Sequence, residues 1–180
     1  MRMLIVMLAV MLVAPSAHSE KTTLTRADLQ VMAHYHAVNQ MEIKLGTLAM
    51  QNVDSVPVQE YGAMLVKDHT AADAALVALA KKTGQRIPAE KPTTSAERYE
   101  QAEAIANANH LSKLNGPELE AKFLATMVHN HERELIRLDA MIARTKSPEL
   151  AAMLRSTKPV LQHHADHARG LQKNDLQAMR

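Results

Sequence analysis

Apolar residues recur at alternating intervals of four and three positions along four long stretches of the chain. This spacing is typical of helices that bury one face against neighbouring helices. Turn-forming residues separate the stretches at 54–57, 83–93, 115–117 and 146–148. We therefore predict long helices over about residues 25–52, 57–83, 117–145 and 148–173, which together form an all-α, ferritin-like four-helix bundle.

The connection between the second and third long helices is itself long. Within it, residues 95–111 favour a short, polar helix. The whole connection, from Gly84 to Gly116, can cross the full length of the bundle, so the two hairpin turns are expected at opposite ends. Pro159 lies inside the last predicted helix, where it is expected to kink or interrupt that helix.

One ionisable side chain interrupts the apolar face of each long helix: Glu42, His69, His131 and His164. At about 1.5 Å per residue, Glu42 and His69 lie roughly 18 and 22 Å from the turn that they share. By the same rise, His131 and His164 lie roughly 22 and 27 Å from theirs. Since each helix spans about 42 Å, turns at opposite ends would bring all four side chains together near the middle of the bundle.

Three imidazoles and a carboxylate in an apolar interior are a ligand set for a four-coordinate divalent ion. Zn²⁺ fits this set, and Cu²⁺ also accepts it. The alternative is a buried Glu–His network that satisfies its own hydrogen bonds without a metal. Asp68 and Asp73 flank His69 in the sequence, where they either orient its imidazole or remain solvated.

Two other metal sites are weaker candidates. His163 and His167 are one helical turn apart and form a possible surface pair, although exposed histidines at this density often bind nothing. A di-iron centre of the ferritin type needs carboxylates from all four helices and two Glu-x-x-His motifs. The chain has no Glu-x-x-His, and Glu42 is the one carboxylate on an apolar face, so we expect no di-iron centre.

The amino-acid composition excludes several classes of function. The chain has 180 residues, no Cys and 2% aromatic residues, which excludes disulfides, thiolate metal sites and stacking platforms for bases. Lys and Arg total 21 against 19 Asp and Glu, with no charged block, so nucleic acid is not an expected partner.

The first 19 residues have the features of a secretory signal peptide: Arg2, an apolar stretch over residues 4–13, and the small-residue site around Ser19. We expect cleavage near Ser19, a single domain over 20–180 with its core over 25–173, and a periplasmic or secreted location. No later apolar run reaches about 18 residues, so a membrane-spanning body is not expected.

Four segments resemble an exported bacterial family called domain of unknown function 4142, whose members are often labelled predicted outer-membrane proteins. They are residues 42–49, 64–70 with its Asp-His-Thr, 131–132, and 159–164. The resemblance covers about residues 26–171 and implies a ferritin-like helical bundle of unestablished activity. It also implies that Glu42, His69, His131 and His164 occupy the family's recurring polar positions. In residues 119–123, Phe123 stands where the family usually has Tyr.

Together these features favour an exported protein that binds Zn or Cu inside the bundle, in a binding, storage or stress-protection role. Two alternatives stay open: a structural or interaction module of the cell envelope without metal, and an oxidoreductase with an open metal coordination position. An enzyme is the less expected class, because the chain has no nucleophile elbow or glycine-rich loop.

Overall fold

The computed structural model describes residues 23–178, with side chains to residue 174. This part of the chain is all-α. Its helices are α1 (Arg26–Asn52), α2 (Val56–Lys82), α3 (Ser95–Leu111), α4 (Gly116–Arg144) and α5 (Pro148–Ala178). Each predicted helix is present within a few residues of its expected bounds. The predicted signal peptide lies outside the described residues, and no described helix is long and apolar enough to cross a membrane.

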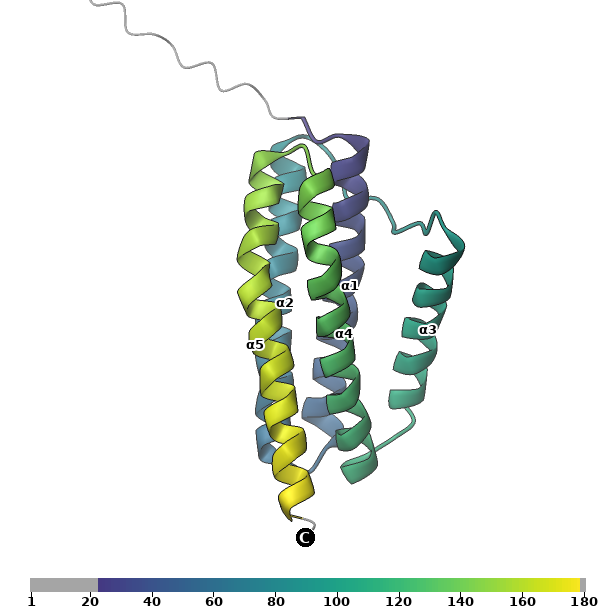
Figure 1. Cartoon of the computed structure of the whole chain (residues 1–180), viewed down its shortest axis with the longest axis vertical. Helices are drawn as coiled ribbons and strands as arrows, with labels where there is room; N and C mark the ends of the chain where they lie inside the picture. The colour runs from purple at the N-terminus through teal and green to yellow at the C-terminus, as the bar shows by residue number, and fades with distance from the viewer. Residues whose placement is uncertain (1–22, 179–180) are drawn as a thin grey trace, which may run out of the picture.

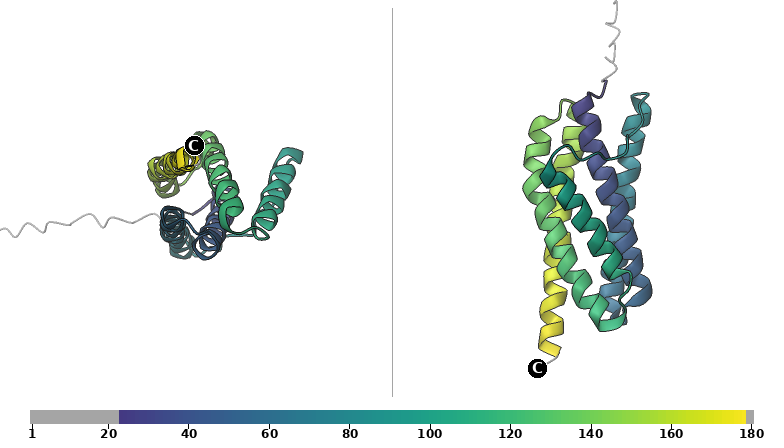
Figure 2. Two further views of the ribbon diagram at one scale, coloured as in Figure 1. Left: turned by 90° about the horizontal axis from the view of Figure 1, so that it is seen from below. Right: turned by 90° about the vertical axis from the view of Figure 1, so that its right-hand side faces the viewer.

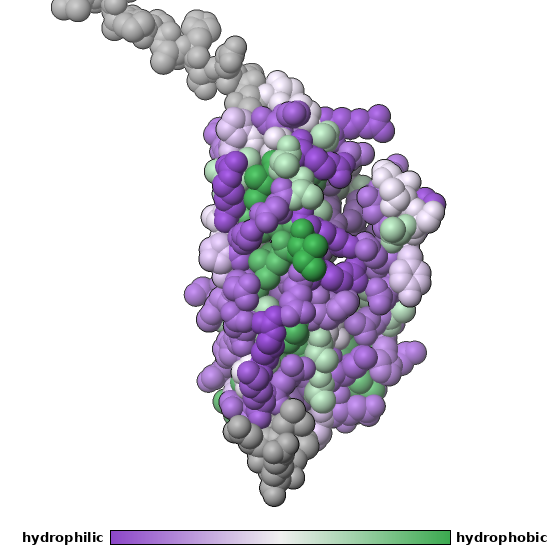
Figure 3. All heavy atoms as spheres, in the orientation of Figure 1, coloured by the Kyte–Doolittle hydropathy of each residue, from purple (hydrophilic) through white to green (hydrophobic). Residues whose placement is uncertain are grey.

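Four of the helices pack side by side, and the short helix stands outside them (Figures 1 and 2). The closest packing lies within two hairpins, α1 with α2 and α4 with α5, while α1 also contacts α4 and α2 contacts α5. The two hairpin turns lie at opposite ends, as predicted, because the connection through α3 returns along the bundle (Figure 1). The face formed by α4 and α5 is mostly polar (Figure 3).

Polar contacts attach the crossover to the bundle. His34 on α1 bridges Glu90 of the crossover, at 2.8 Å, and Glu134 of α4, at 2.9 Å. Burial alone would lower the pKa of His34, but the hydrogen bonds to the two carboxylates raise it to about 9. His34 is therefore charged at neutral pH and holds the crossover against α1 and α4.

A capping box begins α1 and also joins it to the other hairpin. The Thr25 side chain accepts from the Asp28 backbone N–H, and the Asp28 carboxylate accepts from the Thr25 backbone N–H. The second carboxylate oxygen of Asp28 accepts from the backbone N–H groups of Lys146, at 2.8 Å, and Ser147, at 3.2 Å. One buried side chain thus connects the start of α1 to the turn between α4 and α5.

The α5 helix continues through Pro159, so the interruption predicted at this position does not occur. Proline removes one backbone donor and crowds the preceding turn. The ring of Pro159 lies on the exposed side of the helix. The carbonyl of Met153, one to two turns earlier, accepts from the hydroxyls of Ser156 and Thr157.

The core consists of two apolar clusters with a polar layer between them. One cluster, around Leu45, Leu65 and Met127, fills the end with the α1–α2 turn. The other, around Tyr35, Leu76 and Leu138, fills the opposite end. On all four long helices the predicted ionisable residue lies in the interval between the two clusters, so the four occupy one layer of the bundle.

The two helices of the first hairpin, α1 and α2, approach each other closely where two glycines meet. A Cβ atom added to Gly46 would lie 2.7 Å from the carbonyl oxygen of Gly62, and the reverse substitution would meet the Gly46 carbonyl at the same distance. Real Cβ atoms do not approach backbone oxygen this closely, so each residue must lack a side chain if α1 and α2 are to keep this spacing.

We expect Gly46→Ala to lower the free energy of unfolding by about 1–3 kcal/mol, because the helices must separate to admit the methyl group. The matched control is Gly170→Ala on α5, where an added Cβ meets nothing within 4 Å. There the better helix propensity of Ala should raise stability by about 0.5–1 kcal/mol. Urea unfolding of the two variants measures both values, and equal effects would contradict the packing argument.

Candidate metal centre

Three of the four predicted site residues form one group. His69 on α2, His131 on α4 and His164 on α5 each offer a ring nitrogen, and the three nitrogens lie within 4.8 Å of one another. The ring centroids are 5.1–5.8 Å apart. All three side chains are buried, with exposed fractions of 5%, 2% and 0%. Histidines separated by up to 95 positions along the chain therefore meet in the interior.

Hydrogen bonds on the outer side of two rings determine which nitrogen faces inward without a proton. His131 Nδ1 donates to the backbone carbonyl of Met127 at 2.8 Å, which leaves its Nε2 as an acceptor. His164 Nε2 donates to the Asp68 carboxylate at 3.1 Å, which leaves its Nδ1 as an acceptor. These two inward nitrogens face each other at 3.2 Å.

The third ring has the same arrangement. His69 Nδ1 donates to the side-chain oxygen of Asn39 at 2.9 Å, and Asn39 is itself buried. The other ring nitrogen, Nε2, is buried and has no hydrogen-bond partner among the described residues. The three imidazoles thus direct their other ring nitrogens at a common point, and each outer N–H is held by an oxygen acceptor, as carboxylates and carbonyls hold the outer N–H of metal-binding histidines.

The spacing of the nitrogens is compatible with a small metal ion. Zn–N bonds of about 2.0–2.1 Å in tetrahedral geometry place two ligand nitrogens about 3.3 Å apart. The nitrogens of His131 and His164, 3.2 Å apart, already have this separation. The upper limit of 4.8 Å in the group means that His69 would close by at most about 1.5 Å, a small rotation of its ring.

Glu42, the fourth predicted residue, lies in the same layer but outside this group. It is 3% exposed, and one carboxylate oxygen accepts from the side chain of Asn130 at 3.2 Å. The other oxygen, Oε2, is buried with no partner among the described residues. Burial raises the pKa of Glu42, while His131 and the Asn130 hydrogen bond act in the opposite direction.

The acidic residues that flank His69 in the sequence form hydrogen bonds with other residues and not with His69. Asp68 bonds His164 instead of its neighbour, and Asp73 bonds His36 at 2.5 Å and Gln40 at 2.8 Å. The oxygen on His69 comes from Asn39, which sequence reasoning missed. Asn39 lies four residues after Tyr35 and three before Glu42, so it shares their helical face, and that spacing was the available signal.

The surface pair on α5 is close but incomplete. The rings of His163 and His167 have centroids 5.9 Å apart, and the His167 ring also packs on Tyr61 at 5.2 Å. His163 is exposed. Neither residue belongs to a group of three possible ligands within the described part of the chain.

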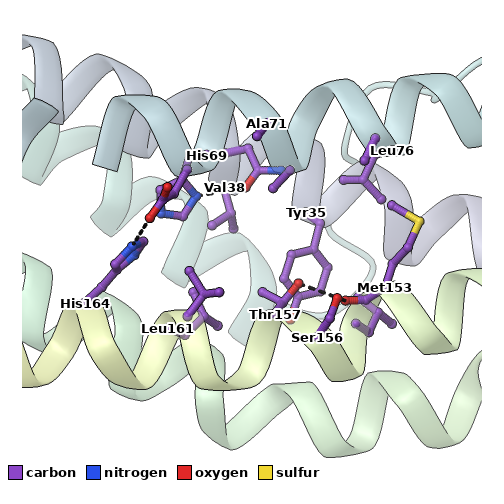
Figure 4. A pocket seen from close by; sticks show the side chains of 16 residues that line it. Tyr35, Val38, His69, Ala71, Leu76, Met153, Ser156, Thr157, Leu161 and His164 are labelled. Atoms are coloured by element: carbon purple, nitrogen blue, oxygen red, sulfur yellow. Dashed lines mark hydrogen bonds and ion pairs between the residues drawn. The ribbon is translucent and has the colours of Figure 1, made fainter. Parts of the chain in front are cut away.

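Two cavities border the polar layer from different sides. A pocket of about 320 Å³ between α2 and α5 is lined by His69 and His164 and then runs along apolar side chains toward Met153 (Figure 4). A cleft of about 910 Å³ lies between α3 and the α1–α4 face, and Glu42 and Asn130 line it together with many charged side chains. Two of the imidazoles and the carboxylate therefore border chemically different spaces.

Comparison with known proteins places the chain in a family. Residues 13–171 match the family described as domain of unknown function (DUF4142). The chain belongs to this family. The DUF4142 resemblance deduced from four short segments is thus confirmed over most of the sequence. No curated protein matches this DUF4142 chain in sequence.

A solved structure has a similar fold. The crystal structure of a DUF305 fragment from Deinococcus radiodurans aligns with a TM-score of 0.72 and 16% sequence identity. The alignment covers 84% of the DUF4142 chain and 99% of the fragment. At this identity the likeness concerns the arrangement of helices alone.

The pKa of His69 gives a test of how the polar layer affects stability. Burial, followed by the neighbouring His131 and His164, lowers the pKa of His69 to about 3. Burial likewise lowers the pKa of His164 to about 4, against the Asp68 hydrogen bond. An unfolded histidine titrates near 6.5. Between these values the unfolded chain binds protons that the folded chain does not, so stability falls as the pH falls.

We therefore expect His69→Gln to remove part of this pH dependence. In the presence of chelator, the difference in unfolding free energy between the wild type and His69→Gln should shrink by about 1.4 kcal/mol per pH unit from about pH 6 to pH 4. Urea unfolding at several pH values measures this difference. A difference that is constant over that range would mean that His69 titrates alike in the folded and unfolded chains.

Proposed function

We propose that this DUF4142 protein binds one transition-metal ion, Zn²⁺ or Cu²⁺, through His69, His131 and His164. The observation that carries the proposal is the set of three inward ring nitrogens within 4.8 Å of one another, on rings whose outer nitrogens each have an oxygen partner. Lone pairs that face one another at 3.2 Å repel unless a cation lies among them. Three nitrogen ligands with a remaining coordination position suit both ions.

The competing explanation is a proton shared between His131 and His164, which would make the layer a metal-free hydrogen-bond network. That proton would create an imidazolium in a site where burial and adjacent rings disfavour positive charge. A metal ion is also positive, but it gains coordinate bonds to three nitrogens, and structural Zn²⁺ sites reach apparent binding free energies of about 10–16 kcal/mol. The metal therefore compensates for burial in a way that a single proton does not.

Glu42 is proposed to neutralise part of the metal charge, either as the fourth ligand or from just outside the ligand shell. Its unpartnered Oε2 and its electrostatic interaction with His131 support this role. Because burial favours the protonated carboxyl, ion binding should release a proton from Glu42. Because metal binding and proton release are coupled in this way, metal affinity should be highest at a pH at which the imidazoles and the carboxylate carry no extra proton.

The broader role that we propose is binding, storage or stress protection in the periplasm or outside the cell, after removal of residues 1–19. The signal-like sequence of that segment supports this location. The single long crossover between two hairpins supports a ferritin-like relationship. The group of three possible ligands consists of histidines and contains no carboxylate, so the proposal is a mononuclear site and not a di-iron centre.

The central test compares two matched double variants. Wild-type protein and His163→Gln/His167→Gln, which changes the surface pair, should each bind one Zn²⁺ per chain. The His69→Gln/His131→Gln variant should bind none in the interior. At free metal 100 times the dissociation constant, binding stabilises the fold by about 2.7 kcal/mol, so the melting temperature should rise by about 5–10 °C.

Metal content by elemental analysis and melting curves with and without chelator measure these outcomes. Electron paramagnetic resonance of the Cu²⁺ form should show hyperfine coupling to nitrogen in the wild type and in the surface variant. Equal metal content in all three proteins, or a melting temperature that chelator leaves unchanged, would instead favour the metal-free structural module.

A second experiment isolates the carboxylate. Because burial disfavours the charged carboxylate at this position, Glu42→Gln should change the stability of metal-free protein little, yet weaken metal binding about 10- to 100-fold. Calorimetry in buffers of different ionisation enthalpy should detect a released proton in the wild type that the variant lacks. The exposed Glu132→Gln on α4 is the control and should bind like the wild type. An unchanged metal affinity in Glu42→Gln would show that Glu42 takes no part in binding the ion.

A further inference from the structure

The pocket between α2 and α5 has a carboxylate at one end and apolar walls along the rest of its length. His164 lies at one end of the pocket, and Leu76 and Met153 lie at the other (Figure 4). Asp68 also lines the pocket, and its carboxylate accepts a hydrogen bond from the His164 ring at 3.1 Å. The negative charge of Asp68 therefore lies at the His164 end.

The Asp68 carboxylate remains accessible to a ligand while it holds His164. The side chain of Asp68 is 34% exposed, whereas that of His164 is fully buried. The bond to His164 uses Oδ2, and Oδ1 makes no hydrogen bond among the described residues. An ionised carboxylate only accepts hydrogen bonds and has about four lone-pair sites. Asp68 can thus accept from a second donor without releasing the His164 ring.

The apolar part of the pocket arises from small side chains on one helix. Three alanines of α2 line this space, and Leu161 of α5 lines its other wall: they are Ala71, Ala72 and Ala75. The resulting volume of about 320 Å³ is at the lower end of the range of small-molecule sites. A molecule built on one small ring fits this volume, and its affinity comes from the apolar surface that it buries.

The charges of the lining restrict the chemistry of the occupant. Among the described residues that line the pocket, none is Lys or Arg, and the single carboxylate is Asp68. An anion would meet repulsion from Asp68 and no counter-charge. A neutral molecule would gain only from the apolar walls. A cation with an apolar body would gain from both the walls and the carboxylate.

From these observations we propose that the pocket binds a small organic monocation, a protonated amine with an apolar body. The ammonium group pairs with the Asp68 carboxylate, and the body lies against the alanines of α2. The apolar walls supply most of the affinity, and Asp68 selects for positive charge. The site borders His69 and His164 but does not depend on the proposed metal, so binding should persist in the presence of chelator.

Three probes of nearly equal shape test the selection for charge: benzylamine, benzyl alcohol and benzoate. We expect benzylamine to bind the full chain about 2- to 5-fold more tightly than benzyl alcohol, the effect of one partly exposed ion pair. Benzoate should bind most weakly of the three. Methylamine keeps the charge but lacks the ring, so it should bind at least about 10-fold more weakly than benzylamine. NMR titrations in amine-free buffer with chelator measure the four dissociation constants.

Variants then assign the preference to Asp68 and the affinity to the pocket. Asp68→Asn should equalise benzylamine and benzyl alcohol and keep the wild-type dissociation constant for the alcohol. Glu60→Gln removes the same charge from an exposed position of α2 outside the pocket and should behave like the wild type. Ala72→Leu should fill part of the pocket and weaken both probes. Ala74→Leu, at an exposed position of α2 that does not line the pocket, should weaken neither.

The salt dependence of the wild type gives the same test without a variant. From about 0.01 M to about 1 M NaCl the Debye length falls from about 30 Å to about 3 Å, so a partly exposed ion pair is screened. The advantage of benzylamine over benzyl alcohol should therefore disappear at high salt, while the alcohol should bind no more weakly than at low salt.

Four results would overturn the proposal. The first is no saturable binding of any probe, and the second is benzyl alcohol or benzoate as the tightest ligand. The third is a preference for benzylamine that neither Asp68→Asn nor high salt reduces. The fourth is methylamine binding as tightly as benzylamine, which would mean pairing at the surface without use of the pocket. None of these outcomes bears on metal binding, because the titrations with chelator succeed or fail independently of the ion.

Discussion

The interior of the bundle is apolar at both ends and polar in the middle, and the middle layer is stable only if its polar groups are held in defined protonation states. Each of three imidazoles there gives its outer N–H to an oxygen: a backbone carbonyl for His131, an amide for His69 and a carboxylate for His164. The same bonds direct the remaining nitrogens inward. The orientation of each ring, and with it the candidate chemistry of the centre, follows from hydrogen bonds made on its outer side.

The layer also divides the molecule into two environments. On the α2–α5 side, alanines leave a largely apolar pocket that borders His69 and His164. On the α1–α4 side, helix α3 lies apart from the four packed helices and leaves a cleft lined by many charged side chains. Glu42 also lines this cleft. The crossover that creates this cleft is itself attached by charge, through His34 and its two carboxylates. The polar layer is therefore bordered by a largely apolar space on one side and by a space lined with charged side chains on the other.

The likeness to the DUF305 fragment indicates how loosely this fold depends on individual residues. The helices of two chains that are 16% identical align over nearly all of the fragment. A helical bundle needs apolar residues at the correct period and turns at the correct places, and many sequences meet those needs. The arrangement of lone pairs needs specific side chains at specific positions, so the shared fold says nothing about whether the fragment has such a centre.

The sequence by itself determined the helices, the opposite placement of the two turns and the common level of Glu42, His69, His131 and His164, because periodicity and a constant rise per residue are local properties. It could not decide which side chains touch. Asp68 bonds His164 and not its neighbour His69, Asn39 supplies the oxygen that His69 needs, and Glu42 lies outside the group of three nitrogens. These choices depend on the rotation of each helix about its axis and on the rotamer of each side chain. Both are decided only when all four helices pack together.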